Sequence, residues 1–278
     1  MSQALDNETL PPRAARADRW RIALALALWA IGLWLWLPQI RSWLPLPWPE
    51  RSFPTPNGPR TYYLVAPSAI HPGERFPLLF FLQGFDGLGS PSIGTGETYL
   101  AIADQVEARR FIAVFPRGWP GAFPERPDVR AWYPEGLAAN REFLAALARH
   151  LIASWPVDPE RVILAGFSNG GYFAAIEALT RPDSPFTAFW LDGGAYPYAL
   201  HPAVPRRRIL LSAGERDEHN LPQIEIFRQF ILDHGWEEGR NLRTYRHRWA
   251  HVFAVWALAE ALDFLGAPAS APASLAGP

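Results

Sequence analysis

A serine flanked by glycines is the feature of this sequence with the clearest chemical meaning. The residues Gly166-Phe167-Ser168-Asn169-Gly170 match the pattern G-x-S-x-G, between an apolar run that ends at Ala165 and a helical pattern. In a sharp strand-to-helix turn of this kind the serine protrudes above a sheet, and the glycines let strand and helix approach closely. We therefore expect Ser168 to be a nucleophile. The alternative is an N-cap serine in a glycine-rich turn.

A base and an acid should accompany this serine, because a serine hydroxyl is a weak nucleophile at neutral pH. In strand–helix proteins with this turn, the acid and the histidine follow the serine in chain order. Asp217 comes just after the apolar run Arg208–Ser212, and His251 comes after the next predicted strand. We expect His251 to be the base and Asp217 to be the acid, both at the carboxyl ends of parallel strands. Asp192, which follows the preceding strand, is the competing acid.

Two backbone N–H groups are needed to stabilise the oxyanion that such a serine generates. One should be the N–H of Asn169, the residue after the nucleophile. The other should come from the loop Gln83-Gly84-Phe85-Asp86-Gly87, which follows a predicted strand. Phe85 is the candidate, because Gly84 lets the chain turn inward. The alternative is a glycine-rich connector without a role.

Four segments carry a resemblance to a known superfamily. From about Tyr62 to Leu265 the sequence resembles the α/β-hydrolases, and in particular polyhydroxybutyrate-depolymerase-like, feruloyl-esterase-like and phospholipase/carboxylesterase-like enzymes. The segments are PLLFFLQGFDG, VDPERVILAGFSNGG, SAGERDEHNLP and AHVFAVW. The resemblance implies the α/β-hydrolase fold, a Ser168–Asp217–His251 triad and hydrolysis of an acyl ester. Many relatives have His-Gly where this chain has Gln83-Gly84.

The elements that must position these residues alternate along the chain. Several strand candidates are continuously apolar, as strands buried on both faces must be. Strand–helix alternation of this kind predicts a doubly wound, mostly parallel α/β sheet with helices on both faces. The strand candidates are Tyr62–Ala66, Pro77–Leu82, Phe111–Phe115, Arg161–Ala165, Phe186–Leu191, Arg208–Ser212 and Leu242–Tyr245. The helix candidates are Glu97–Arg109, Leu137–Ser154, Gly170–Leu179, Leu221–His234 and Val252–Leu265.

Composition excludes several classes of function. The chain has 278 residues, a formal net charge of −1 and no cysteine. The near-neutral charge gives no electrostatic case for binding nucleic acid. The absence of cysteine removes disulfides, cysteine-based zinc sites and thiol nucleophiles. His247 and His251 have a spacing that binds metals on a helix, but a strand and a loop separate them, so we expect neither a metal nor a cofactor.

The N-terminal region contains a long apolar run. Residues 22–37 are uncharged, and a helix of this length spans roughly 24 Å, against roughly 30 Å of hydrocarbon in a bilayer. If the helix continues to Ile40, its length comes close to the thickness of the hydrocarbon core. We expect one uncleaved transmembrane signal-anchor over 22–40, with the N-terminus cytoplasmic because Arg13, Arg16 and Arg19 precede the run. A cleaved signal peptide of a secreted enzyme and a buried core helix are the alternatives.

The expected organisation has five parts. Residues 1–21 are cytoplasmic, 22–40 span the membrane, 41–59 are a proline-rich linker, 60–265 form the hydrolase domain and 266–278 are a disordered tail. We expect a serine esterase of the inner membrane whose catalytic domain is periplasmic or extracellular, acting on a small-molecule or polymeric ester. Peptidase or acyltransferase chemistry on the same triad is one alternative, and a catalytically silent, membrane-tethered binding module is another.

Overall fold

The structure is a computed structural model of the chain. It describes residues 21–32, 45–87, 93–121, 125–127, 129–132 and 136–266. The chain divides into two compact units, Met1–Leu44 and Pro45–Pro278. In the first unit, residues 21–32 form a helix. No helix within the described part of the chain is both long enough and apolar enough to cross a membrane. The rest of the expected span, 33–40, lies outside the described residues, as do most of 1–21 and 267–278.

The second unit is built on one eight-stranded sheet with the order β1-β2-β5-β3-β8-β9-β10-β11. The strands from β5 to β11 run parallel, whereas β2 is antiparallel to β5 and β1 is antiparallel to β2. The predicted mostly parallel sheet is therefore present. The strands are β1 (Arg51–Phe53), β2 (Arg60–Val65), β3 (Phe76–Leu82), β5 (Ile112–Pro116), β8 (Val157–Phe167), β9 (Ala188–Asp192), β10 (Arg208–Gly214) and β11 (Leu242–His247).

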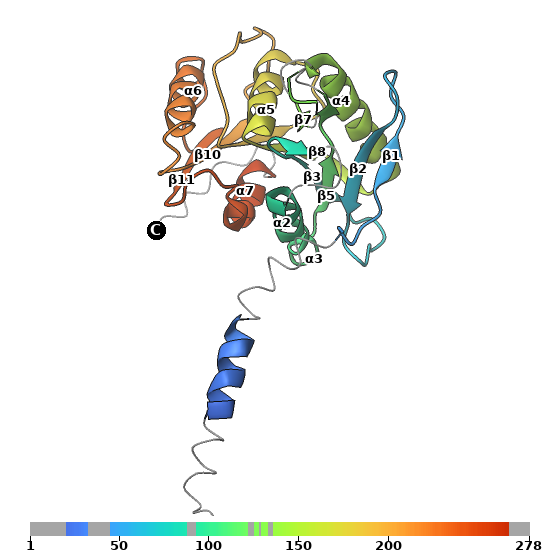
Figure 1. Ribbon diagram of the computed structural model, residues 1–278. Coiled ribbons are helices and arrows are strands. Elements are labelled where there is room, and N and C mark those ends of the chain that lie inside the picture. The colour runs from blue at the N-terminus through green and yellow to red at the C-terminus, as the bar shows by residue number, and fades with distance from the viewer. Residues whose placement is uncertain are drawn as a thin grey trace, which may run out of the picture. The chain divides into compact units, whose positions relative to one another are not determined.

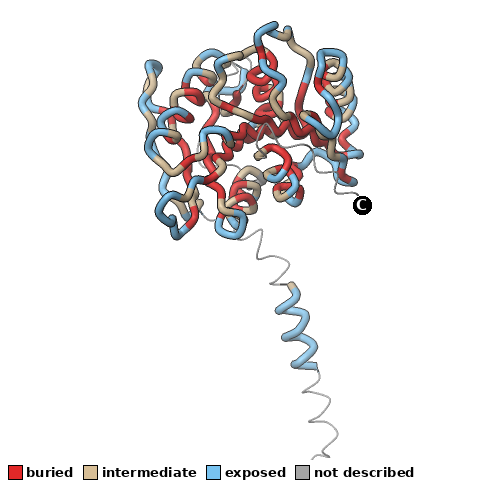
Figure 2. The backbone as a smooth tube through the Cα atoms, turned by 180° about the vertical axis from the view of Figure 1, so that it is seen from behind, coloured by how far each residue is buried: buried red, intermediate tan, exposed pale blue. Residues whose placement is uncertain are grey.

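Both faces of this sheet are covered by helices, which explains why its strands are apolar throughout. Side chains alternate along β3, so that Phe80 packs into the core on one face and Phe81 into the core on the other. Helices α4, α5 and α6 cover the first face, and α2, α3 and α7 cover the second (Figure 1). Figure 2 shows the buried residues concentrated in the strands, with exposed residues on the outer sides of the helices.

The helix bounds agree with the predictions except near Asp104 and His251. α4 (Leu137–Ser154), α5 (Asn169–Thr180) and α6 (Leu221–Asp233) lie where the apolar spacing placed them. The predicted helix Glu97–Arg109 is two helices, α2 (Ile93–Ala103) and α3 (Val106–Arg109). The predicted helix Val252–Leu265 is a 3-10 turn over Val255–Ala257 followed by α7 (Leu258–Leu265), so His251 lies in a loop rather than at a helix start.

The compact unit begins before residue 60, where the sequence predicted the domain to start. Within the expected linker, Trp48 stacks on Phe115 with ring centroids 5.9 Å apart, and Phe53 packs against the core. The three residues of β1 contain no proline, so they can pair with β2 at the sheet edge, where neighbouring prolines are tolerated. A second, three-stranded sheet was not predicted; it joins β4 (Asp86–Gly87), β7 (Val129–Ala131) and β6 (Trp119–Pro120).

Candidate active site

Ser168 occupies a strained turn between β8 and α5, and this turn can be followed in Figure 1. Its backbone angles are φ 52° and ψ −117°, a conformation that residues with a side chain rarely adopt. The flanking glycines are required by close contacts of the backbone. A Cβ on Gly166 would lie 2.2 Å from the carbonyl oxygen of Gly170, and one on Gly170 would lie 2.4 Å from that of Leu82. The turn therefore has the geometry expected for a nucleophilic serine.

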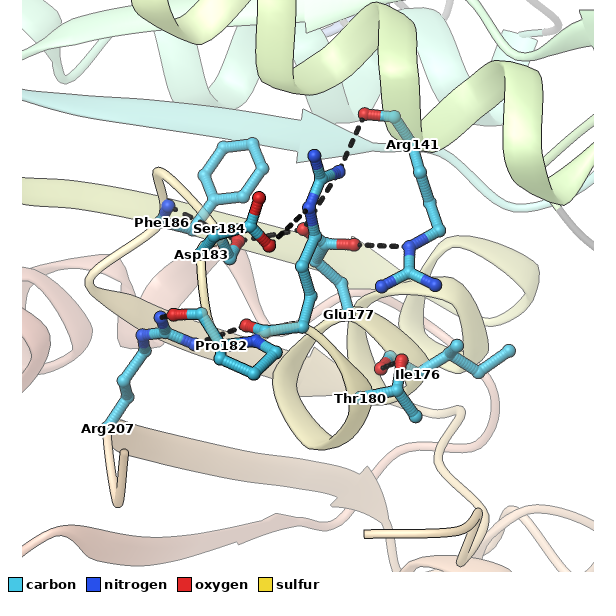
Figure 3. A network of polar contacts seen from close by, with 10 residues as sticks. Arg141, Ile176, Glu177, Thr180, Pro182, Asp183, Ser184, Phe186 and Arg207 are labelled. Atoms are coloured by element: carbon cyan, nitrogen blue, oxygen red, sulfur yellow. Dashed lines mark hydrogen bonds and ion pairs between the residues drawn. The ribbon is translucent and has the colours of Figure 1, made fainter. Parts of the chain in front are cut away.

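A buried carboxylate holds the helix that follows this turn. Glu177 of α5 is 1% exposed and accepts a hydrogen bond of 2.9 Å from Arg141 of α4. Its other oxygen accepts a hydrogen bond of 2.8 Å from Ser184 and lies 3.6 Å from the guanidinium of Arg181 (Figure 3). A buried charge is stable only when it is paired in this way. These contacts fix α5 against α4 and against the loop that leads to β9.

Asp217 and His251 are brought together by the loops after β10 and β11. His251 Nδ1 lies 2.5 Å from Asp217 Oδ2, and the two loops are joined by a hydrogen bond from Arg216 N to Trp249 O. A Cβ on Gly214 would lie 2.2 Å from the carbonyl oxygens of Trp249 and Ala250, so the loops meet only because this residue is glycine. The structure thus brings together the two residues that the sequence analysis expected to be the acid and the base.

Asp217 is ionised in this setting. Burial by itself raises the pKa of its carboxyl group, but hydrogen bonds from His251 and Asn220 together outweigh burial and hold the pKa below its ordinary value. A negative carboxylate is the state that can orient a neutral imidazole and support an imidazolium.

Asp192, the competing acid, does not contact His251. Its side chain is fully buried, and Oδ2 accepts a hydrogen bond of 2.7 Å from the backbone N–H of Ala254. Burial raises the pKa of Asp192 to about 8. Its carbonyl oxygen accepts the backbone N–H of Ser168 at 2.8 Å. Asp192 therefore connects the turn of Ser168 to the loop beyond His251.

Ser168 and His251 line the same cavity, which has a volume of about 650 Å³. The Phe167 ring packs on the imidazole with centroids 4.6 Å apart. On another side of the imidazole, a Cβ at Gly193 would lie 3.0 Å from its Cε1 atom. Within the described residues no hydrogen bond joins Ser168 to His251; in unliganded active sites such bonds are often long and tighten with substrate.

Of the expected oxyanion residues, Asn169 directly follows Ser168 in the chain and Phe85 lines the same cavity as Ser168. Asn169 is the first residue of α5, and its buried side chain accepts a hydrogen bond of 2.8 Å from the backbone N–H of Trp132. Phe85 is 57% exposed and lines the cavity, whereas Asn169 does not. A Cβ on Gly84 would lie 3.3 Å from that of Ser168, which shows how closely this loop passes.

Gln83, which directly precedes Gly84 in the loop after β3, is buried and lines the cavity. Its Oε1 atom accepts a hydrogen bond of 3.3 Å from the Tyr99 hydroxyl. This contact connects the loop after β3 to α2 and supports the position of Gly84.

Other histidines have no place in the site. His247 is the last residue of β11, buried, with its ring edge-on to Trp256 at 5.1 Å. The described part of the chain contains no group of three His, Asp or Glu side chains arranged to hold a metal ion.

Sequence reasoning missed Asn220, whose side chain reaches both Asp217 and His251. The available signal was its position three residues after the acid, directly before a predicted helix. The contact with His251 joins residues far apart in sequence, and no local pattern reports it.

Comparisons with known proteins identify the fold. No family model and no curated protein matches the sequence. A thermostable esterase superposes with a TM-score of 0.59 at 18% identity, covering 79% of this chain; the chain spans 62% of that esterase. A ferulic acid esterase superposes with a TM-score of 0.57 at 14% identity, and the match covers 78% of this chain and 96% of that esterase. A Bacillus cereus carboxylesterase superposes with a TM-score of 0.52 at 13% identity, and the match covers 74% of this chain and 93% of the carboxylesterase. The chain has the α/β-hydrolase fold, and esterases are among the solved structures that it resembles.

Proposed function

We propose that the protein is a serine hydrolase that cleaves a carboxylic ester through an acyl-enzyme. The observation that carries this proposal is the meeting of two separate features at one cavity. Ser168 is held in a strained turn, and His251 is held by an ionised Asp217. Neither feature is sufficient for catalysis alone, but together they supply a nucleophile, a base and a group that orients the base.

The reaction runs in two halves. The Ser168 hydroxyl oxygen attacks the ester carbonyl carbon while His251 Nε2 accepts the hydroxyl proton. The N–H groups of Asn169 and Phe85 stabilise the oxyanion, which collapses as His251 returns the proton to the departing alcohol. Water then repeats the sequence on the acyl-enzyme and releases the carboxylic acid and free Ser168.

The cavity favours an ester with an apolar group. Hydrophobic side chains from the loop after β3, from β8 and from the segment after His251 form most of its wall: Phe85, Phe167, Val252, Phe253 and Val255. Apart from Gln83, Ser168 and His251, the polar lining residues come from α2, where Thr95, Glu97 and Thr98 line the cavity. A cavity of this size and character buries an aromatic or short aliphatic group and contacts polar substituents along one edge.

Hydrolysis of a graded panel of p-nitrophenyl acyl esters tests the proposal. We expect turnover by the wild-type chain, loss of turnover in Ser168→Ala, and labelling of Ser168 by a fluorophosphonate. Ser154→Ala is the matched control, because Ser154 is exposed on α4 and its hydroxyl donates to the His150 carbonyl of the same helix. Absence of both turnover and labelling would instead indicate a silent binding module. Transfer of the acyl group to an added alcohol in preference to water would indicate a transferase.

We further propose that residues 22–40 anchor the chain in the inner membrane, with the catalytic domain periplasmic or extracellular. In support, the large apolar side chains of the described helix are all exposed, including Ile22 (61%), Leu26 (63%) and Trp29 (70%). A water-exposed helix with apolar side chains on every face is unfavourable, and lipid would cover it. We expect the chain to remain with membranes after carbonate extraction. A mature N-terminus between residues 38 and 60 would show a cleaved, secreted enzyme.

A further inference from the structure

Asn220 makes an unusual set of contacts with the acid and base of the site. Its amide nitrogen Nδ2 lies 2.9 Å from Asp217 Oδ1, 3.1 Å from Asp217 Oδ2 and 3.1 Å from His251 Nδ1. Its backbone N–H also donates to Asp217 Oδ1, at 3.1 Å. The residue is 7% exposed and does not line the cavity. Asn220 is therefore placed to act on the acid and the base without touching a substrate.

Helix capping does not account for this side chain. Asn220 occupies the N-cap position of α6, where an asparagine ordinarily accepts a hydrogen bond from an N–H of the first turn. Here the side chain makes no such bond. Its amide is turned instead toward the Asp217 carboxylate, at the expense of the cap.

Tyr172 of α5 fixes the orientation of this amide. The Tyr172 hydroxyl lies 3.1 Å from Asn220 Oδ1 and 2.5 Å from Gln223 Oε1. A hydroxyl has one proton to donate, and Asn220 Oδ1 needs it if Nδ2 is to face the carboxylate. Rotation of the Gln223 amide presents its nitrogen to the hydroxyl oxygen and leaves the proton for Asn220. The helix that begins at the nucleophile thus orients the group that contacts the acid.

We propose that Asn220, oriented by Tyr172, is a positioning residue that holds the Asp217 carboxylate in the geometry that binds His251 Nδ1. The inference rests on the proposed function. The N–H dipole of Asn220 stabilises the carboxylate and disfavours a positive imidazolium, since it points at both. Loss of this dipole makes the acid–base pair hold its protons more tightly, so activity must appear at higher pH.

The other titratable groups near Asp217 and His251 are the same in the wild type and in a variant at Asn220. Asp192 lies behind it on β9, and Tyr172 faces it from α5. His247 and Glu215 lie at the ends of β11 and β10, and Glu218 and His219 belong to the loop of Asp217. Because none of them is changed, a shift in the pH profile can be assigned to Asn220.

The test compares Asn220→Asp and Asn220→Ala with wild type in p-nitrophenyl ester hydrolysis from pH 5 to 9, using the full chain. Aspartate has the size of asparagine and is an equally good N-cap, so a purely structural role predicts wild-type behaviour. We expect kcat to fall about tenfold or more in both variants, with KM nearly unchanged. The acidic limb of kcat/KM should move to higher pH by about half a unit or more, further for Asn220→Asp. Tyr172→Phe should show the same shift, but smaller.

Two further measurements separate the possible failures. Asn241→Asp, far along the chain next to the start of β11, controls for adding a carboxylate. The low-field proton NMR resonance of the Asp217–His251 hydrogen bond reports the geometry without relying on activity, and we expect it to move in both Asn220 variants. Folded variants with a wild-type pH profile and an unmoved resonance would overturn the inference. Residual hydrolysis by Ser168→Ala in the same series would instead overturn the proposed function.

Discussion

Replacing Asp192 by asparagine should make the protein increasingly more stable than wild type as the pH rises. The carboxyl group of Asp192 is fully buried, and its pKa of about 8 lies well above the ordinary value of 3.8. The folded protein therefore keeps this proton between about pH 4 and 8, whereas the unfolded chain loses it. A group whose pKa is raised by folding stabilises the protein fully below the unfolded pKa, and this contribution is lost as pH rises to the folded pKa.

The magnitude follows from the two pKa values. Each pH unit in this interval lowers the free energy of unfolding of the wild type by at most ~1.4 kcal/mol. The full interval from 3.8 to about 8 therefore lowers it by about 6 kcal/mol as an upper bound. Asparagine does not titrate, and its side-chain oxygen can accept the Ala254 N–H that Asp192 Oδ2 accepts now. The free energy of unfolding of Asp192→Asn should therefore rise relative to that of the wild type by roughly 1 kcal/mol for each pH unit between about 5 and 8.

Urea unfolding at about pH 5, 6.5 and 8 measures this difference directly. Asp233→Asn serves as the control for replacing a carboxyl group, since Asp233 is exposed and accepts a hydrogen bond from the Gln229 side chain of its own helix. A difference between Asp192→Asn and wild type that stays constant with pH would refute the reasoning. A growing advantage of wild type at high pH would show that Asp192 is ionised in the folded protein. The variant should also keep kcat within about tenfold of wild type, because Asp192 does not touch His251.

Three further outcomes follow from the site. Asp217→Asn should remain folded by circular dichroism and lower kcat by roughly 10³–10⁴, because the imidazole loses its correct tautomer and its electrostatic support; near-wild-type turnover would assign the acid elsewhere. Gly194→Ala places a Cβ 2.2 Å from the Ser168 carbonyl oxygen, so we expect activity to fall sharply and unfolding to cost about 1–3 kcal/mol less; wild-type kinetics would contradict this contact. In wild type, kcat/KM should rise with pH and then level off, because a histidine must be neutral to act as a base, and a flat profile would argue against a histidine base.

The parallel part of the sheet could be predicted because its strands are buried on both faces. Burial on both sides forces continuous apolar runs such as Leu78–Leu82, and these are visible without any knowledge of the partner strand. The edge strand β1 and the short strands β4, β6 and β7 leave no such signal, because two or three residues paired at an edge need no apolar pattern. The break between α2 and α3 was missed because the apolar spacing continues across it.

The sequence narrowed the candidates for the carboxylate beside His251 to two residues but could not choose between them. Asp192 is the last residue of β9 and Asp217 follows the neighbouring parallel strand β10, so both were bound to lie near the end of β11. What separates them is the partner of each carboxyl group: Asp192 accepts a hydrogen bond from the backbone N–H of Ala254, and Asp217 contacts the imidazole of His251. That difference depends on how two loops cross at Gly214, which is a property of the folded chain alone.

The place of β1 in the sheet order has a mechanical consequence. Any pull on the chain from residues before Pro45 enters the domain through the segment of Trp48 and β1, at the edge of the sheet opposite β10 and β11. Four strand spacings, roughly 19 Å, separate β1 from β8 and the turn of Ser168. A load at this point would peel the three-residue β1 from β2 before it reached the acid and base loops. Under tension the edge strand β1 would thus separate first, while the loops that hold Ser168, Asp217 and His251 keep their geometry.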